Sequence, residues 1–287
     1  MKHIYLNLKR FDVPAALGGV NRIAPIADWA ETIIAETRAG LAAYDAGQVD
    51  FTMFFPELHL LSAAAAAKDT PIQVGCEGVY RGDVTPGGNF GAFTTKNPAA
   101  AAAAAGAKAV IIGHCEERND LNGILAAAGV DPFSEAAVSA VNGIFNQEIL
   151  AAQARGLSVL YCIGEKAEEQ ERWQEVLGAQ LALGLKGTDT GRIVIAYEPV
   201  WSIGPGRTPA DRDYITKIAR FVKEKTGGLD VVYGGGLKTA NAAMLASIPE
   251  IDGGLIALTR FTGEIGFYPD EYLKIIRLYL TEKGLAQ

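Results

Sequence analysis

The sequence predicts an α/β protein whose strands close into one (β/α)8 barrel. Eight short apolar runs rich in β-branched residues recur along the 287 residues, with longer stretches of helical spacing between them. Strand followed by helix, repeated eight times, is typical of parallel strands joined by crossover helices. The runs are continuously apolar, as in a sheet covered on both faces, and their number favours a closed barrel over an open doubly wound sheet.

We expect the elements in the following places. The predicted strands are residues 4–8, 51–55, 72–76, 109–112, 158–163, 193–197, 231–233 and 254–258. The predicted helices include residues 29–44, 135–154, 167–183, 211–225 and 268–281. Long loops should follow strands one, three and four, at residues 10–27, 78–93 and 119–132. The whole chain, residues 1–287, is predicted to form a single domain.

The composition and charge of the chain argue against several classes of function. The net charge of −7 and the lack of a basic run argue against a nucleic-acid partner, although a local site for a small phosphorylated substrate is compatible with it. No stretch has the length and apolarity of a membrane span, and the N-terminus lacks the apolar core of a signal peptide. Three widely spaced cysteines predict neither a disulfide framework nor a zinc site. These observations predict a cytoplasmic, reduced protein.

Charged side chains follow three of the predicted strands. Lys9 follows the first strand, His114 the fourth and Glu198 the sixth. Because strand ends converge at one face of a barrel, the three could share a pocket, and such groups suit proton transfer beside a carbonyl. Taken singly, each has a simpler interpretation: a solvent-facing or helix-capping carboxylate, or an acidic helix start after His114.

Their order and surroundings resemble the triosephosphate isomerase family. The segment Ala196-Tyr197-Glu198-Pro199-Val200-Trp201-Ser202-Ile203-Gly204 matches the family's signature around its base almost letter for letter. Further matches, in the family's order, are Asn7-Leu8-Lys9, residues 91–94, residues 113–118, Cys162-Ile163-Gly164-Glu165, Tyr233-Gly234-Gly235 and Ile251-Asp252-Gly253. The resemblance spans nearly the whole chain and implies a TIM barrel.

The resemblance also implies roles. Glu198 is expected to be the base that moves a proton between adjacent carbons, His114 the neutral electrophile that polarises the carbonyl, and Lys9 the cation that stabilises the enediolate. Residues 199–208 are expected to form a lid that excludes water. The implied substrate-binding residues are Asn7, Gly204, Gly235, Gly236, Ala257 and Leu258, and the implied supporting residues are Glu116, which would pair with Lys9, and Tyr233.

The resemblance implies no metal and no organic cofactor, a homodimer, and a place in glycolysis and gluconeogenesis. Two alternatives remain open beside the interconversion of dihydroxyacetone phosphate and glyceraldehyde 3-phosphate. One is the same isomerase chemistry on a longer sugar phosphate, as in a tetrulose phosphate isomerase. The other is a non-catalytic barrel that binds a phosphorylated sugar, because a fold alone does not define a function.

The sequence departs from the family around the phosphate and the lid. Leu258 stands where the family has a glycine whose backbone approaches phosphate, and Arg260 offers a compensating charge or points to solvent. Gly236 replaces a serine, and Pro209 stands where the family's closed lid supplies an N–H to a tyrosine. The loop at residues 78–93, which carries the dimer contact in the family, is rebuilt.

Overall fold

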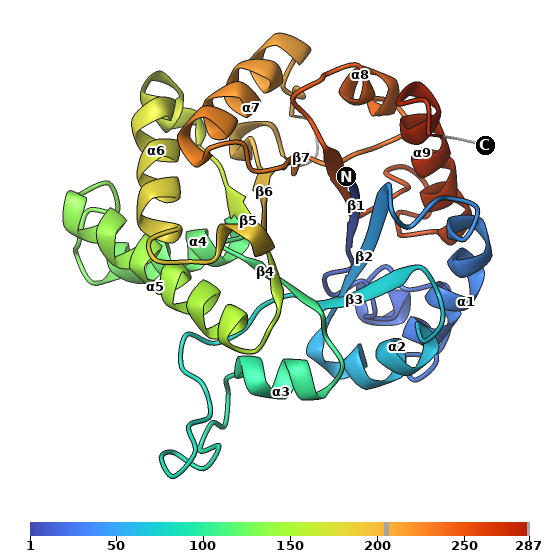
Figure 1. Cartoon of the computed structure of the whole chain (residues 1–287), viewed down its shortest axis with the longest axis horizontal. Helices are drawn as coiled ribbons and strands as arrows, with labels where there is room; N and C mark the ends of the chain where they lie inside the picture. Colours follow the sequence, from blue (N-terminus) through green and yellow to red (C-terminus); the bar gives the residue numbers. More distant parts are fainter. Residues whose placement is uncertain (204–206, 286–287) are drawn as a thin grey trace.

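The computed structural model describes residues 1–203 and 207–285 and shows a closed barrel of parallel strands. Each strand pairs with the next along the chain, and β8 closes the ring by pairing with β1 (Figure 1). The strands are β1 (Lys2–Asn7), β2 (Val49–Phe55), β3 (Ile72–Cys76), β4 (Ala109–Ile112), β5 (Ser158–Ile163), β6 (Ile193–Tyr197), β7 (Val231–Tyr233) and β8 (Gly253–Ile256).

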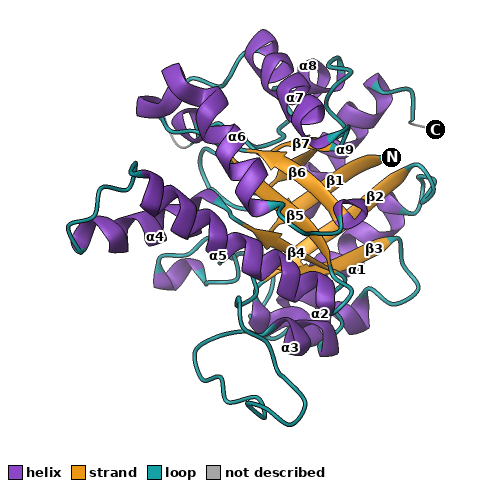
Figure 2. Ribbon diagram, turned by 60° about the vertical axis from the view of Figure 1, so that its left-hand side comes forward, coloured by secondary structure: helices purple, strands orange, loops and turns teal. Residues whose placement is uncertain are grey.

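Helices surround this barrel on its outside (Figure 1, Figure 2). They are α1 (Trp29–Leu41), α2 (Leu60–Ala66), α3 (Ala99–Ala104), α4 (Cys115–Ala127), α5 (Glu135–Ala154), α6 (Trp173–Gly184), α7 (Arg212–Thr226), α8 (Ala242–Ala246) and α9 (Pro269–Glu282). Short 3-10 helices at Ala15–Leu17, Glu57–His59, Ala167–Arg172, Thr190–Arg192 and Val200–Ser202 lie in the connections. None of the described helices has the length and apolarity to cross a membrane.

The predicted barrel is confirmed, and five of the eight strands match the prediction to the residue. Three details were wrong. The last strand ends at Ile256, because the chain turns away before Leu258. Residues 167–172 form a 3-10 helix, and the α-helix begins at Trp173. Most of the predicted loop 119–132 belongs to α4, since the residues after His114 begin a helix at once and continue it to Ala127.

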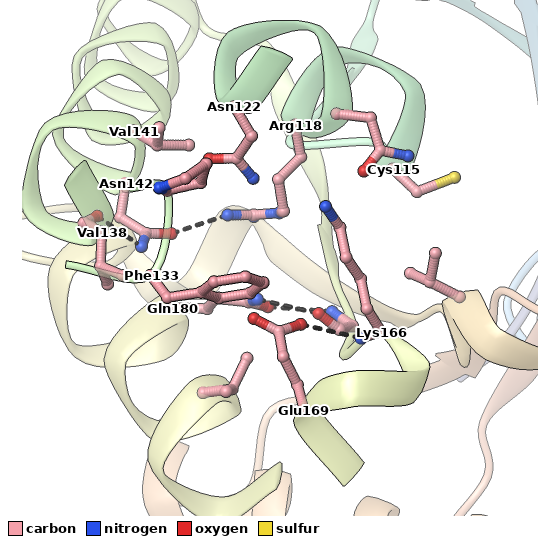
Figure 3. Close-up of a pocket in the computed structure, with 15 residues that line it drawn as sticks. Cys115, Arg118, Asn122, Phe133, Val138, Val141, Asn142, Lys166, Glu169 and Gln180 are labelled. Carbon is pink, nitrogen blue, oxygen red and sulfur yellow. Dashed lines mark hydrogen bonds between the residues drawn. The ribbon is translucent and has the colours of Figure 1, made fainter. Parts of the chain in front are cut away.

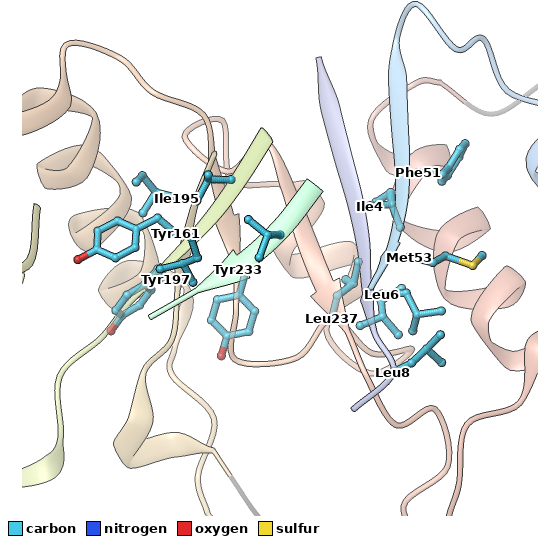
Figure 4. Close-up of a cluster of buried hydrophobic side chains, with 14 of the residues drawn as sticks. Ile4, Leu6, Leu8, Phe51, Met53, Tyr161, Ile195, Tyr197, Tyr233 and Leu237 are labelled. Carbon is cyan, nitrogen blue, oxygen red and sulfur yellow. The ribbon is translucent and has the colours of Figure 1, made fainter. Parts of the chain in front are cut away.

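The side chains of the strands divide between two apolar layers. The barrel interior holds the smaller cluster, which consists of Tyr5, Phe54, Ala109, Ile111, Leu160, Cys162, Ala196, Val232 and Leu255. The larger cluster lies between the strands and the helices, and Figure 4 shows part of it around β1, β2 and β6. Successive side chains of a strand point to opposite faces, so residues i and i+2 share a face. A residue two places beyond the last inward one therefore points into the mouth of the barrel.

Two of the long connections differ in character. The connection after β1 folds back on itself through a bridge between Pro14 and Asn21, and Asn21 donates hydrogen bonds to the carbonyls of Asp12 and Ala24. The connection between β3 and α3 instead extends away from the barrel (Figure 1, Figure 2). Phe90 near its tip is 85% exposed, which leaves a large apolar side chain without cover from this chain.

Candidate active site

A cavity of about 250 Å³ lies at the C-terminal mouth of the barrel. Its lining residues are Asn7, Lys9, Arg10, Glu77, Gly78, Ile111, His114, Glu116 and Glu117. The alternation of the strands explains why Asn7 is in this set, because it lies two residues beyond the inward Tyr5. Glu198, which contacts the lining residue His114, likewise lies two residues beyond the inward Ala196. Lys9, His114 and Glu198, which follow different strands, are therefore brought together at one end of the barrel.

The Glu198 carboxylate is buried, with 2% of the residue exposed, and both of its oxygens have partners. Its Oε1 lies 3.2 Å from His114 Nε2, and its Oε2 accepts a hydrogen bond of 3.0 Å from the backbone N–H of Cys115. Burial raises the pKa of Glu198, while His114 and the Cys115 N–H lower it in part, and the net shift is upward. A buried carboxylate with a raised pKa is a stronger base than one in water.

His114 precedes α4 and caps its N-terminus. Its Nδ1 accepts a hydrogen bond of 3.3 Å from the backbone N–H of Glu116. A ring nitrogen that accepts carries no proton, so the other nitrogen, Nε2, carries it, at 3.2 Å from Glu198 Oε1. The helix dipole at this end also disfavours a positive charge on the ring. His114 is therefore a neutral imidazole whose N–H points toward the site.

Lys9 is held in an unusual backbone conformation. Its φ of 46° lies in the left-handed region, which non-glycine residues rarely adopt. The backbone N–H of Lys9 donates to the side chain of Asn7 at 3.1 Å, and its Nζ donates to Glu116 Oε1 at 2.6 Å. A strained residue fixed by such contacts is typical of functional sites. The ammonium group lies at the edge of the cavity, where it can meet an anion.

Glu77 is a member of this cavity that sequence reasoning missed. It lies two residues beyond Gly75, whose missing side chain makes room for the ring of Phe54 inside the barrel. Its Oε1 is buried and has no hydrogen-bond partner among the described residues. Burial raises the pKa of Glu77 to about 8, although Lys9 and Arg10 lower it in part. An acidic residue at the end of a predicted strand was the available signal.

The segment after Glu198 is anchored by a second buried carboxylate. Glu165 Oε1 accepts three hydrogen bonds, from Trp201 Nε1 at 2.8 Å and from the hydroxyls of Tyr197 and Tyr214 at 2.9 Å each. Trp201 belongs to the 3-10 turn Val200–Ser202, so this network ties the start of the predicted lid to β6 and α7. Glu165 lies in a segment that resembles the family, but the sequence analysis assigned it no role.

The remaining lid residues are placed as follows. Ser202 is the hydrogen-bonding neighbour of the Tyr233 hydroxyl; burial raises the pKa of Tyr233, and this contact lowers it in part. Pro209 lies exposed. The predicted substrate-binding Gly204 lies outside the described residues, as do the rest of residues 204–206.

Backbone N–H groups collect where β7 and β8 end. Within the described chain, no acceptor is found for the N–H groups of Gly235, Gly236, Ala257 and Leu258. Gly234, which precedes them, packs so closely on Glu198 that a side chain there would come within 2.8 Å of Glu198 Cγ. Free N–H groups beside the base suit an anionic ligand. Leu258 thus keeps an available N–H, because its backbone has already left the strand.

Arg260 is not free to bind such a ligand. Its Nε and Nη2 donate to Glu271 Oε1 at 2.8 and 2.6 Å, and its guanidinium lies 3.7 Å from the ring centroid of Tyr268. Its backbone N–H donates to the carbonyl of Gly266. The Arg260 side chain is 35% exposed, is absent from the lining of the cavity and holds the β8 connection onto α9 through Glu271.

A second, smaller cavity of about 70 Å³ lies behind the start of α4 (Figure 3). Arg118 on its wall donates to Asn142 Oδ1 at 2.9 Å, and Gln180 bonds both backbone groups of Gly164 at 2.8–2.9 Å. These contacts fix α4 and the β5 connection against α5 and α6. The residues around this cavity therefore hold in place the helix that follows His114 and begins at Cys115. The cavity is separate from the one at the mouth of the barrel.

The ligand atoms of His114, Cys115 and Glu198 lie within 4.8 Å of one another, which is close enough for a metal ion. Desolvation and the neighbouring Glu198 together raise the pKa of the Cys115 thiol to about 12. A thiol this weakly acidic is a poor metal ligand near neutral pH. The electrostatic contact between His114 Nε2 and Glu198 Oε1, at 3.2 Å, accounts for their closeness without an ion.

The closed barrel and the groups at its mouth define an isomerase of the class that transfers protons beside a carbonyl. The chain belongs to the triosephosphate isomerase family, whose model matches residues 27–277. It is 35% identical to the triosephosphate isomerase of Bacteroides fragilis over 72% of this chain and 78% of that one. It is 33% identical to the same enzyme of Porphyromonas gingivalis over 78% and 83% of the two chains.

A solved structure shares the fold. The crystal structure of triosephosphate isomerase from Bartonella henselae superposes with a TM-score of 0.70 over 97% of this chain and 98% of that one, at 23% sequence identity. The barrel fold is therefore shared at low sequence identity.

Proposed function

We propose that this protein interconverts dihydroxyacetone phosphate and glyceraldehyde 3-phosphate by moving a proton through an enediolate intermediate. The observation that carries the proposal is the buried Glu198 carboxylate, held 3.2 Å from the N–H of a neutral His114 at the barrel mouth. Membership of the triosephosphate isomerase family supports the same reaction. Neither the longer sugar phosphate nor the non-catalytic barrel gains support from the comparisons.

Each group has a step in the proposed reaction. Glu198 removes a proton from the carbon beside the substrate carbonyl and returns it to the neighbouring carbon. His114 Nε2–H donates to the carbonyl oxygen as negative charge develops there, and the Lys9 ammonium stabilises that charge from the cavity edge. Glu198 is bound to His114 and to the Cys115 N–H in this structure, so the substrate has to draw the carboxylate away from both before the proton moves.

Binding and closure involve the flanking loops. The free N–H groups of Gly235, Gly236, Ala257 and Leu258 are proposed to hold the phosphate, together with Gly204 of the lid, and Asn7 the oxygen side of the substrate. Closure of the lid over the enediolate excludes water, which favours proton return over loss of phosphate. Anchoring of Trp201 by Glu165 gives the lid a fixed starting point.

Turnover measurements on three variants test this proposal. We expect Glu198→Gln and Glu198→Ala to lower kcat on glyceraldehyde 3-phosphate by about 10²- to 10⁴-fold, because proton transfer by a positioned base contributes on that scale. Glu250→Gln is the control, since Glu250 pairs with Arg220 and precedes β8 at the opposite end of the barrel. Incorporation of deuterium from the solvent into the substrate should be lost in both Glu198 variants and retained in the control.

Three other results would point elsewhere. Unchanged turnover in Glu198→Ala would disprove the mechanism. Turnover of erythrulose phosphate far above that of triose phosphate would select the longer substrate. Proton exchange on neither substrate would indicate a binding protein.

Assembly and location complete the proposal. We propose a homodimer in which the projecting loop 78–93 packs on a second copy, because Phe90 on that loop is almost fully exposed. Replacing Phe90 with Ser should shift the protein toward a monomer in light-scattering measurements. The free cysteines Cys76, Cys115 and Cys162 suit a reducing compartment, which we propose to be the cytoplasm and in which glycolysis and gluconeogenesis would use the reaction.

A further inference from the structure

The proposed phosphate site needs a cation that the sequence comparison does not supply. A phosphate monoester carries close to two negative charges, and neutral N–H groups alone compensate them only in part. Arg260 is held by Glu271 and by the ring of Tyr268. Lys9 follows β1, the strand that pairs with β8, and its ammonium is already paired with Glu116.

Lys238 lies beside the free N–H groups. It follows β7 by five residues, and its Cε and Nζ come within 3.2 and 3.9 Å of the position that a side chain on Gly236 would occupy. Gly236 has a φ of 94°, and the absence of a side chain there leaves the space that the Lys238 chain fills. The replacement of the family's serine by Gly236 is therefore what brings this ammonium to the end of β7.

The surrounding turn is rigid. The N–H of Lys238 donates to Asn241 Oδ1 at 2.7 Å, and Asn241 Nδ2 donates to the carbonyl of Gly236 at 2.9 Å. The N–H of Leu237 donates to the carbonyl of Leu255 in β8 at 2.9 Å. These bonds hold the backbone of the segment between β7 and β8 from which the Lys238 side chain extends.

The ammonium of Lys238 has no carboxylate partner among the described residues, unlike Lys2, Lys9 and Lys223. It lies 4.3 Å from the ring centroid of Phe261 in the β8 connection, and the side chain is half-buried. Burial lowers the pKa of Lys238, because the charged form loses hydration and no carboxylate compensates for that loss. An anion beside the Lys238 ammonium would stabilise its charged form.

We propose that Lys238 binds the phosphate group of the substrate, with its ammonium lying between the ends of β7 and β8. The inference rests on the proposed function, which supplies a phosphorylated substrate. It gives the Gly235–Gly236 and Ala257–Leu258 N–H groups a neighbouring positive charge in place of Arg260. Phe261 covers the lysine stem and holds the ammonium toward the strand ends.

Phosphate binding is measured separately from turnover, so that the two proposals can fail separately. The probe is inorganic phosphate, titrated by calorimetry and tested as a competitive inhibitor. Lys238→Met, which keeps the length and removes the charge, should weaken phosphate binding and raise KM for glyceraldehyde 3-phosphate by about tenfold each, with kcat within about threefold. Lys238→Arg should restore most of both. Lys225→Met is the matched control, because Lys225 also lies over an aromatic ring, Phe221, without a carboxylate partner in the described chain.

The outcomes separate clearly. Phosphate affinity and KM within twofold of the unmodified protein in Lys238→Met, with a normal melting temperature, would overturn the inference and leave the isomerase intact. Equal losses in Lys225→Met would also overturn it, since the effect would then be one of overall charge. Phosphate binding that depends on Lys238 in a protein without turnover on any sugar phosphate would support the inference and reject the proposed function.

Discussion

Each end of the barrel holds a histidine between two carboxylates, and the two rings differ in their hydrogen bonds. At the C-terminal mouth, His114 lies between Glu198 and Glu116. At the N-terminal end, His3 in β1 lies between Asp50, 3.2 Å from Nδ1, and Asp230, 2.9 Å from Nε2. The same side chain on the same scaffold thus meets similar charges at both ends.

The difference lies in what the second nitrogen contacts. His114 Nδ1 accepts from a helix N–H, which leaves one proton on the ring. Both nitrogens of His3 face carboxylates, so both donate when the ring is charged. Burial lowers the pKa of His3, but Asp230 and Asp50 together raise it more, and the net shift is upward. The helix N–H therefore fixes the proton of His114 on Nε2, while two aspartates favour the charged form of His3.

The largest expected effect comes from exchanging the two histidines for glutamine. His114→Gln should lower kcat by about 10²-fold or more, because the donor aimed at the substrate oxygen is lost from its fixed position. His3→Gln should leave kcat within about twofold, since His3 lies at the far end of the barrel. Steady-state kinetics at pH 7 compare the two. Similar losses in both would show that the barrel ends are not functionally separate.

A smaller effect should come from Glu77, the acid at the mouth with an unpaired oxygen. Its pKa of about 8 means that it is neutral at pH 7 and becomes charged as the pH rises through that value. A carboxylate beside the cavity repels an anionic substrate, so kcat/KM should fall about 3- to 10-fold between pH 7 and pH 9. Glu77→Gln, which mimics the neutral acid, should remove most of that fall. An unchanged pH profile in the variant would assign the titration to another group.

Periodicity was sufficient to predict the barrel, because strands buried on both faces leave a continuous apolar signal. The interior and exterior clusters both draw on β1, for example, through Tyr5 and Leu6 respectively. The pattern failed where a helix has a polar sequence. Residues 115–127 contain four charged side chains and a glycine, so α4 lacks the apolar stripe that would have predicted it.

The site was predictable where residues follow strand ends, and less so where tertiary contacts decide. Lys9, His114 and Glu198 stand directly after strands, so their convergence follows from topology. Arg260 could not be placed, because its direction depends on Glu271 eleven residues away and on the ring of Tyr268. Lys238 was missed for a related reason: its position depends on the space above Gly236 and on Phe261 in another loop.

The smallest expected effect concerns the N-terminal end, and it is one of stability. Because the folded-state pKa of His3 is raised above its usual value near 6.5, the charged ring stabilises the fold fully below that pH, and this contribution disappears as the pH rises through the folded-state pKa. His3→Gln should therefore lower Tm by about 2–4 °C at pH 5.5, the scale of ~1 kcal/mol in a chain of this size, and by less at pH 9. Asp50→Asn should reduce the same pH dependence, since Asp50 faces His3 Nδ1 beside the Tyr5 hydroxyl. Calorimetric scans measure Tm of His3→Gln and of the unmodified protein across this pH range. An equal difference in Tm at every pH would contradict the assignment. A neutral packing contact would give that result, whereas the effect of an imidazolium between two aspartates depends on pH.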